Sequence, residues 1–289
     1  MLSKKLYLIF TIGAVIPMVL VVFVLSWHDR WVILWMIPFV ILLSMTYIFS
    51  PQIDWWWYQK HPPKLAEPMS MMLMRYFPFY KNLSAENKKR FRQRTQMYME
   101  ARGFYGKLGG ESESVPLDIK TIISANAVML TFGKKEFILD PFERVFLYLQ
   151  AFPSPQFPKH IHASEIEMED HVFLFSAEHI NFSFRNPQKY YNIVVHEYAK
   201  AFKVVYDKFD YPSFDERIWN GFSKEVILKF MNLPDVEAYP VSVNFFFYYP
   251  EKFKTVLPDV YEKYKTIFNL DPMNGKNPVI DKQPILNVV

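Results

Sequence analysis

The sequence contains no cysteine, which removes disulfide bonds, thiol catalysis and thiolate metal ligands together. Any metal site must therefore be built from histidine and carboxylate side chains. Glycine is also scarce, with 8 residues in 289, whereas 51% of the residues are hydrophobic and 18% are aromatic. This composition excludes a disordered or low-complexity chain and indicates a large buried core.

A strong excess of one charge is absent as well. The formal net charge is only +4, and nucleic-acid binding requires a dense basic stripe or a recognisable binding module. We therefore expect no nucleic-acid partner. The sequence also has no internal repeat, no glycine-rich phosphate-binding loop and no nucleophile elbow.

Two uncharged stretches, residues 6–27 and 31–53, dominate the N-terminal region. Each is close to the ~20 residues that an α-helix needs to cross a bilayer. Only His28, Asp29 and Arg30 separate them, so residues 1–62 are expected to form a transmembrane hairpin with both ends on one side. A cleaved signal peptide is the alternative for the first stretch, but its apolar run is long and lacks a small-x-small cleavage site.

Basic residues set the expected orientation of the hairpin. Four lysines flank the side that holds both ends, and a single arginine lies opposite: Lys4, Lys5, Lys60 and Lys64 against Arg30. The positive-inside bias makes the lysine-rich side cytoplasmic, and the run Trp55 to Tyr58 suits the headgroup level. We expect an integral protein of a bacterial inner membrane that contacts lipid through the hairpin, with its soluble domain in the cytoplasm.

After Pro62-Pro63 the sequence becomes a soluble α+β mixture. Helices are predicted from a cap at Ser84 to about Arg102, from Leu117 to Thr131, and over much of the chain after Pro187. Short β-rich runs are predicted as strands at Glu136–Leu139, Val145–Ala151 and His171–Phe175. One face of the first helix is basic and is expected to be solvated, with anionic lipid as the alternative partner; it carries Lys88, Lys89, Arg90, Arg92 and Arg94.

Residues 192–200, NIVVHEYAK, carry the most informative motif. They match the zinc-peptidase motif H-E-x-x-H except that the second histidine is Lys200. In the intact motif two histidines on one helix face bind Zn²⁺, and the glutamate activates the metal-bound water. His196 therefore occupies the first-ligand position and Glu197 the general-base position. The protonated Lys200 offers no lone pair and repels a cation.

Five segments in order extend this match. The sequence resembles the Mlc titration factor A family, a glucose-regulated metallopeptidase family, over about residues 74–272. The resemblance rests on FPFYKNLS at 77–84, ARGFYG at 101–106, IISANA at 122–127, NIVVHEYA at 192–199, and the stretch from Glu237 through YPEKF at 249–253 to Tyr264 and Asp271-Pro272. It implies a zincin-like metallopeptidase domain over 74–272, followed by a C-terminal tail over 273–289.

The family's third zinc ligand is a glutamate before an aromatic triplet, and Asn244 stands at the matching position before residues 245–247, FFF. The resemblance thus implies that two of three ligand positions, Lys200 and Asn244, are replaced. The charges of Lys200 and Glu197 balance without a metal. We expect a catalytically impaired pseudopeptidase with no cofactor, which binds a cytosolic protein or peptide in the former substrate cleft.

Two other functions stay open. One is an active zinc-dependent aminopeptidase, in which His196 recruits zinc with other ligands, chosen from His171, His179, Asp207, Asp210 and Asp215. The other is a structural membrane protein whose domain supports an assembly.

Two further groups of residues could bind a metal or face solvent. His160 and His162 could form a metal pair on one side of a strand, although exposed histidines there are commoner. The acidic stretch of Glu165, Glu167, Glu169 and Asp170 is predicted to be a solvated turn.

Overall fold

The computed structural model describes residues 2–24, 31–107, 114–213 and 216–280. The chain divides into two compact units, Met1–Pro63 and Lys64–Val289. This boundary follows the Pro62-Pro63 pair.

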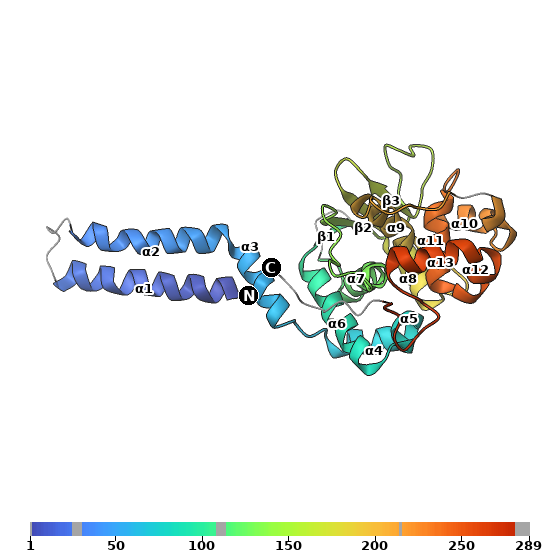
Figure 1. Cartoon of the computed structure of the whole chain (residues 1–289). Helices are drawn as coiled ribbons and strands as arrows, with labels where there is room; N and C mark the ends of the chain where they lie inside the picture. Colours follow the sequence, from blue (N-terminus) through green and yellow to red (C-terminus); the bar gives the residue numbers. More distant parts are fainter. Residues whose placement is uncertain (1, 25–30, 108–113, 214–215, 281–289) are drawn as a thin grey trace. The chain divides into compact units, whose positions relative to one another are not determined.

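The N-terminal unit consists of three helices: α1 (Leu2–Val24), α2 (Trp31–Ile48) and α3 (Ser50–Lys60). Helices α1 and α2 lie side by side and run in opposite directions (Figure 1). They approach closely at Gly13, where an added Cβ would lie 3.6 Å from Cε1 of Phe39. The predicted turn residues His28, Asp29 and Arg30 lie outside the described residues.

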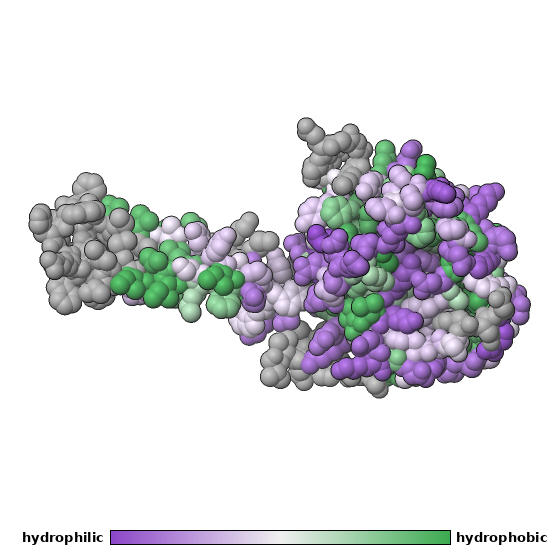
Figure 2. Space-filling view, turned by 90° about the horizontal axis from the view of Figure 1, so that it is seen from above, coloured by the Kyte–Doolittle hydropathy of each residue, from purple (hydrophilic) through white to green (hydrophobic). Residues whose placement is uncertain are grey.

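Many of the described side chains of α1 and α2 are apolar and exposed, and Figure 2 shows hydrophobic patches in this part of the molecule. Leu8 and Ile9 are each 60% exposed, and Ile48 is 64% exposed. In the parts of the chain that the structure describes, no helix taken singly has the length and hydropathy to cross a membrane. One bent pair, Ile37–Ile48 with Ser50–Lys60, meets the requirement on length and composition together. The two membrane spans therefore stay a prediction.

The second predicted span differs from the structure at its end. Residues 31–53 were expected to form one helix, but α2 ends at Ile48 and α3 begins at Ser50, with a bend of 67° between them. Pro51 lies in the first turn of α3. Proline has no amide hydrogen to donate to the preceding turn of α2, whereas it is favoured in the first turn of a helix, so a new helix starts at Ser50.

The second unit contains a four-stranded sheet with the order β1-β2-β4-β3. Strands β1 (Gly103–Lys107), β2 (Arg144–Tyr148) and β4 (Val172–Ser176) are parallel, and the edge strand β3 (Ser164–Glu167) is antiparallel to β4. Val145 of β2 and Phe173 of β4 are fully buried, and they pair in register. The sheet confirms the predicted mixed α+β fold.

Four helices build the region of the predicted site: α6 (Ala85–Glu100), α7 (Leu117–Thr131), α9 (Ile193–Val205) and α11 (Ala238–Tyr248). Helix α9 contacts β3, β4, α7 and α11, and α7 also packs on α6 (Figure 1). The remaining helices are α4 (Glu67–Tyr76), α5 (Pro78–Asn82), α8 (Ala177–Arg185), η1 (Glu216–Asn220), α10 (Lys224–Met231), α12 (Pro250–Val256) and α13 (Pro258–Phe268). Residues after α13 return to α6, where Lys276 O accepts from Ser84 N at 3.2 Å.

Two predictions about local structure were wrong. Residues 136–139 form a loop instead of a strand. Side chains, and not a neighbouring strand, donate hydrogen bonds to two backbone carbonyls of this loop. Thr131 Oγ1 donates to Phe137 O at 3.1 Å, and the Tyr206 hydroxyl donates to Glu136 O. The acidic stretch is a solvated turn only in its second half, because Ser164–Glu167 is β3 and Glu165 is 5% exposed.

The basic residues of α6 also differ from the expected solvated or lipid-facing surface. Arg94 is buried and its Nη1 donates to Thr131 O at 3.3 Å and to Phe132 O at 3.1 Å, while Arg90 Nη2 donates to Phe132 O at 3.3 Å. These carbonyls belong to the C-terminal end of α7, where the helix dipole favours cations. The two arginines therefore cap a neighbouring helix.

Candidate functional site

Helix α9 carries His196, Glu197 and Lys200, and it starts where Asn192 caps its first turn. Asn192 Oδ1 accepts from Val195 N at 3.0 Å, which satisfies one of the free amides at the helix start. His196 is 1% exposed and Glu197 is fully buried, whereas the Lys200 side chain keeps 19% of its surface exposed. Of these three side chains, only Lys200 therefore reaches solvent.

Both carboxylate oxygens of Glu197 are engaged. Ser164 Oγ on β3 donates to Oε1 at 2.8 Å, and Lys200 Nζ lies 3.0 Å from Oε2. The second contact has ion-pair distance without the angle of a hydrogen bond, so it stabilises mainly through charge. The residue at the general-base position is thus held by a hydroxyl and an ammonium.

Tyr191 and Asn244 complete the cluster around His196. The Tyr191 hydroxyl lies 2.7 Å from His196 Nδ1. Asn244, on α11 and 3% exposed, donates from Nδ2 to Asn192 O at 2.7 Å, next in the chain to Tyr191. The structure therefore brings His196, Glu197, Lys200 and Asn244 together around the start of α9, in a mostly buried cluster.

Burial and neighbouring charge keep the two rings of this cluster neutral. Burial, with a smaller contribution from the Lys200 ammonium, lowers the pKa of His196 well below its usual value. Burial raises the pKa of Tyr191 well above its usual value; the nearby Asn244 amide opposes this rise, and the Glu197 carboxylate adds to it. Lys200 and Glu197, with Nζ 3.0 Å from Oε2, form the ion pair of the cluster.

A network of side-chain amides and a phenol joins the three helices behind the cluster. Asn192 Nδ2 donates to Asn126 Oδ1 on α7 at 3.1 Å and to the Tyr248 hydroxyl on α11 at 2.8 Å. The Tyr248 hydroxyl donates to Asn126 Oδ1 at 3.0 Å. These bonds fix the start of α9 against α7 and α11. Asn126 and Asn192 lie in segments that resemble the family but had no predicted role, and Tyr191, Ser164 and Tyr248 were not predicted to belong to the site.

The side chains considered as alternative zinc ligands beside His196 make other contacts or face solvent. His179 Nδ1 lies 2.9 Å from Ser176 Oγ, His171 packs edge-on against Phe142, and Asp210 pairs with Lys263 at 2.6 Å. Asp207 is exposed, and Asp215 lies outside the described residues. The described part of the chain contains no group of three His, Cys, Asp or Glu residues that could hold a metal ion.

His160 and His162 do not form the predicted pair. His162 is buried, with Nδ1 3.0 Å from Ser164 O and Nε2 3.1 Å from both Ser154 Oγ and Glu165 Oε2. His160 is only partly buried and lies outside the named strands. His162 thus ties the loop before β3 to Glu165, because both of its ring nitrogens have partners in the protein.

Zinc does not fit the residues at the three ligand positions. His196 offers one imidazole, Lys200 a cation, and Asn244 an amide whose nitrogen end faces a backbone carbonyl. Catalytic zinc in proteins takes three protein ligands and a water, and an ammonium group cannot replace an imidazole as a donor. The three side chains therefore offer too few ligand atoms for zinc.

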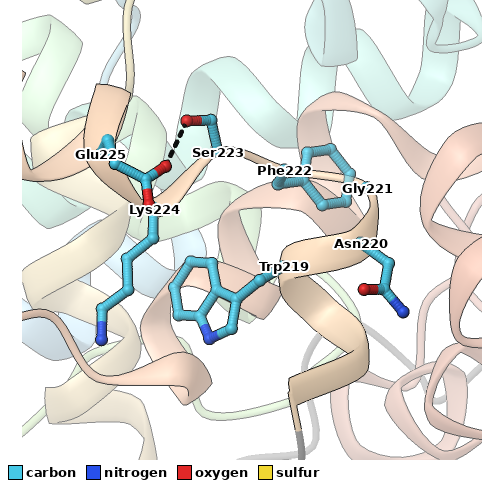
Figure 3. A pocket seen from close by; sticks show the side chains of 7 residues that line it. All are labelled: Trp219, Asn220, Gly221, Phe222, Ser223, Lys224 and Glu225. Atoms are coloured by element: carbon cyan, nitrogen blue, oxygen red, sulfur yellow. Dashed lines mark hydrogen bonds between the residues drawn. The ribbon is translucent and has the colours of Figure 1, made fainter.

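A separate cavity of about 440 Å³ lies along the segment from Trp219 to Glu225 (Figure 3). Ser223 Oγ donates to Glu225 Oε2 at 2.8 Å at its wall. Phe222 lines the cavity and stacks on Phe245, the residue after Asn244, with ring centroids 3.3 Å apart. None of the predicted site residues lines it.

Comparison with protein families matches residues 54–213 to the glucose-regulated metallo-peptidase M90 family, which is just over half of the 289 residues. The match includes His196, Glu197 and Lys200 but ends before Asn244. No curated protein was found to be similar to the chain. Because the match covers more than half of the sequence, including the helix that carries the motif, the chain belongs to the glucose-regulated metallo-peptidase M90 family.

Proposed function

We propose that this chain is a catalytically impaired, membrane-anchored member of its family that binds a peptide or protein segment without cutting it. The observation that carries the proposal is the ion pair between Lys200 Nζ and Glu197 Oε2, at 3.0 Å. It places a built-in cation beside the glutamate whose family role is to activate a metal-bound water. The Lys200 ammonium neutralises the Glu197 carboxylate, which would otherwise act as the general base.

Electrostatics opposes adding a dication to this pair. Two like unit charges 4 Å apart repel by about 4 kcal/mol at an effective dielectric constant of 20, and a dication doubles that figure. Glu197 is already neutralised by Lys200, and Asn244 adds no negative charge. A metal would therefore enter without the carboxylate charge that normally anchors it.

The proposed ligand is a peptide or protein segment because the family scaffold serves peptide substrates. Lys200 is the partly exposed member of the cluster, so its ammonium is the group that such a ligand would reach first. The membrane anchor, lipid contact and cytoplasmic location are further parts of the proposal. The uncharged stretches and the exposed apolar surface of α1 and α2 support them.

Metal analysis and peptidase assays test the proposal directly. We expect the purified full-length protein, dialysed after exposure to zinc, to hold no stoichiometric zinc and to hydrolyse no aminopeptidase substrate above background. The double variant Lys200→His with Asn244→Glu should retain about one equivalent of zinc, since it restores all three ligand types. Each single variant should remain one ligand short.

Lys203→His is the matched control, because it adds a histidine to an exposed position of the same helix. It should leave the metal content of the unmodified protein unchanged. Zinc at about one equivalent in the unmodified protein, lost on His196→Ala, would overturn the proposal.

An active peptidase is the second candidate, and membership of a metallo-peptidase family is the observation that favours it. It requires ligands beyond His196, and the described histidines and aspartates named for that role are bonded or placed elsewhere. Zinc-dependent hydrolysis by the unmodified protein that chelators abolish would establish this candidate.

A further inference from the structure

We infer that α3 is a separate helix that lies in the headgroup layer of a phospholipid bilayer and does not continue the membrane span of α2. This placement deepens the proposed membrane anchor, on which it rests. The direction of α3, its composition, the exposure of its side chains and the charges around it all favour the headgroup layer.

Helix α3 runs across the end of the hairpin that α1 and α2 form (Figure 1). Phe49 alone separates α2 from α3, and the chain bends by 67° between them. Helix α3 contacts both α1 and α2. When α2 crosses a membrane upright, a helix that leaves it at this angle runs closer to the membrane plane than to the membrane normal.

Amino-acid composition changes sharply from α2 to α3. Residues 37–48 of α2 include no charged side chain and no side-chain amide. The 11 residues of α3 include an aspartate, a lysine and two glutamines, together with four consecutive aromatic residues. Charged and amide side chains are costly in the hydrocarbon core, whereas tryptophan and tyrosine are enriched at the level of the headgroups. The polar layer of the bilayer therefore suits α3 better than the core does.

The aromatic side chains of α3 are available to lipid. None of the residues of α3 is buried, and the side chain of Trp56 is 47% exposed. Lys60 Nζ lies over the Trp56 ring, 4.2 Å from its centroid, and Trp57 stacks on His61 with ring centroids 3.9 Å apart. Rings with an apolar body and a polar edge match the boundary between acyl chains and headgroups.

Lysines lie at the same end of the N-terminal unit. Lys5 is exposed near the start of α1, and Lys60 is exposed at the end of α3. These two ammonium groups outnumber Asp54, the one acidic residue of α3. Positive charge at this level complements lipid phosphates, so the charges of α3 and its surroundings fit the headgroup layer.

Spin labels measure the depth of each helix in a bilayer. The sequence has no cysteine, so each label attaches only at the cysteine that is introduced. The full-length protein is reconstituted in vesicles of phosphatidylethanolamine and phosphatidylglycerol. Depth is calculated from the relaxation of each label by oxygen, which concentrates in hydrocarbon, relative to that by a water-soluble nickel chelate. The labelled variants, all at exposed positions, are Ile37→Cys, Ile41→Cys, Met45→Cys and Ile48→Cys on α2, and Gln52→Cys, Trp56→Cys and Lys60→Cys on α3.

The two helices should give different depth profiles. Along α2 the depth should change steadily, by about 16 Å from Ile37 to Ile48, because a helix rises ~1.5 Å per residue. From Gln52 to Lys60 the helix rises by about 12 Å, of which the 67° bend leaves about 5 Å along the membrane normal. The three α3 labels should therefore stay near one depth, at the headgroups. Lys203→Cys, at an exposed position of α9, is the aqueous reference and should be relaxed mainly by the nickel chelate.

The outcomes distinguish the inference from the proposed anchor. A depth that keeps changing along α3, by about 12 Å, would show that α3 extends the span and would overturn the inference alone. Labels on α3 that behave like the label at Lys203→Cys would place α3 in water and would overturn it as well. Labels on α2 that also behave like this reference would overturn the anchor and the inference together.

Discussion

At the scale of single residues, the site depends on how a buried carboxylate is neutralised. Glu197 is fully buried, and burying an unpaired charge costs several kcal/mol. Ser164 and Lys200 together occupy its two oxygens, one through a hydroxyl at 2.8 Å and the other through an ammonium at 3.0 Å. A metal ion is therefore not required to make this carboxylate stable in the folded chain.

Removing the cation should destabilise the protein measurably. Lys200→Met keeps a side chain of similar length but leaves Glu197 with only the Ser164 bond, so the free energy of unfolding should fall by roughly 1–3 kcal/mol. The partial exposure of Lys200 keeps this loss below that for a fully buried pair. Denaturant unfolding of the full-length protein measures it.

The double variant Lys200→Met with Glu197→Gln should recover part of that loss, because it removes the unpaired charge. Lys203→Met, at an exposed position one turn further along α9, is the control. It loses only the approach of its ammonium to the Tyr239 and Tyr211 rings, at 5.2 and 5.8 Å, so it should cost no more than about 0.5–1 kcal/mol. A Lys200→Met protein as stable as the wild type would show that the ion pair contributes nothing.

At the scale of elements, the end of α7 depends on α6. The backbone carbonyls of Thr131 and Phe132 accept no hydrogen bond from within α7. Lys134 N donates to Thr131 O at 2.9 Å, and the Arg94 and Arg90 guanidinium groups supply the further donors. Burial lowers the pKa of Arg94 to about 9, so it remains charged at neutral pH. Its guanidinium also lies over the Phe137 ring, 4.7 Å from the centroid, which helps hold the loop that was predicted to be a strand.

Arg94→Met should lower the free energy of unfolding by roughly 1.5–3 kcal/mol, since the hydrogen bonds from a charged donor to Thr131 O and Phe132 O are lost, although Lys134 N and Arg90 still donate to these carbonyls. Thermal or denaturant unfolding measures the change. Lys89→Met, at an exposed position of the same helix, is the matched control and should have little effect. Equal stability of the two variants would contradict the capping role of Arg94.

At the scale of the whole molecule, the N-terminal unit presents apolar side chains that a water-soluble protein would bury. Several side chains of α1 and α2 are about half exposed or more, among them Leu8, Ile9, Val40 and Met45. Such a surface is typical of a unit that contacts lipid or another apolar partner. The proposed bilayer anchor accounts for this exposure.

Carbonate washing and topology reporters test the anchor. The full-length protein should stay in the membrane pellet after alkaline carbonate treatment, because two apolar helices hold it there. A reporter fused after Val289 should be active in the cytoplasm, whereas one inserted between His28 and Asp29 should be active outside it. Release by carbonate would exclude the spans, and exchange of the two reporter results would reverse the orientation.

Local patterns account for the parts of the fold that were predicted. Helix α7 has the predicted bounds, Leu117–Thr131, because its apolar run is long. Ser84 caps α6 as predicted, with its side chain accepting from Asn87 N. Strand β4 was placed to within a residue at each end. Strand β3 was not predicted because a glutamate in an acidic stretch is expected to be exposed, whereas Glu165 is buried beside His162.

The sequence alone determined the motif on α9 and its altered residue, since a four-residue spacing on one helix is a local property. It also determined the apolar character of the N-terminal stretches. Only the tertiary structure decided what surrounds the motif. Ser164 of the edge strand reaches Glu197 from 33 residues away, and the loop before α9 turns the Tyr191 hydroxyl toward the His196 imidazole. Asn244 joins them from 52 residues after Asn192. Hydrogen bonds between distant segments depend on packing and side-chain direction, and no periodicity in the sequence encodes them.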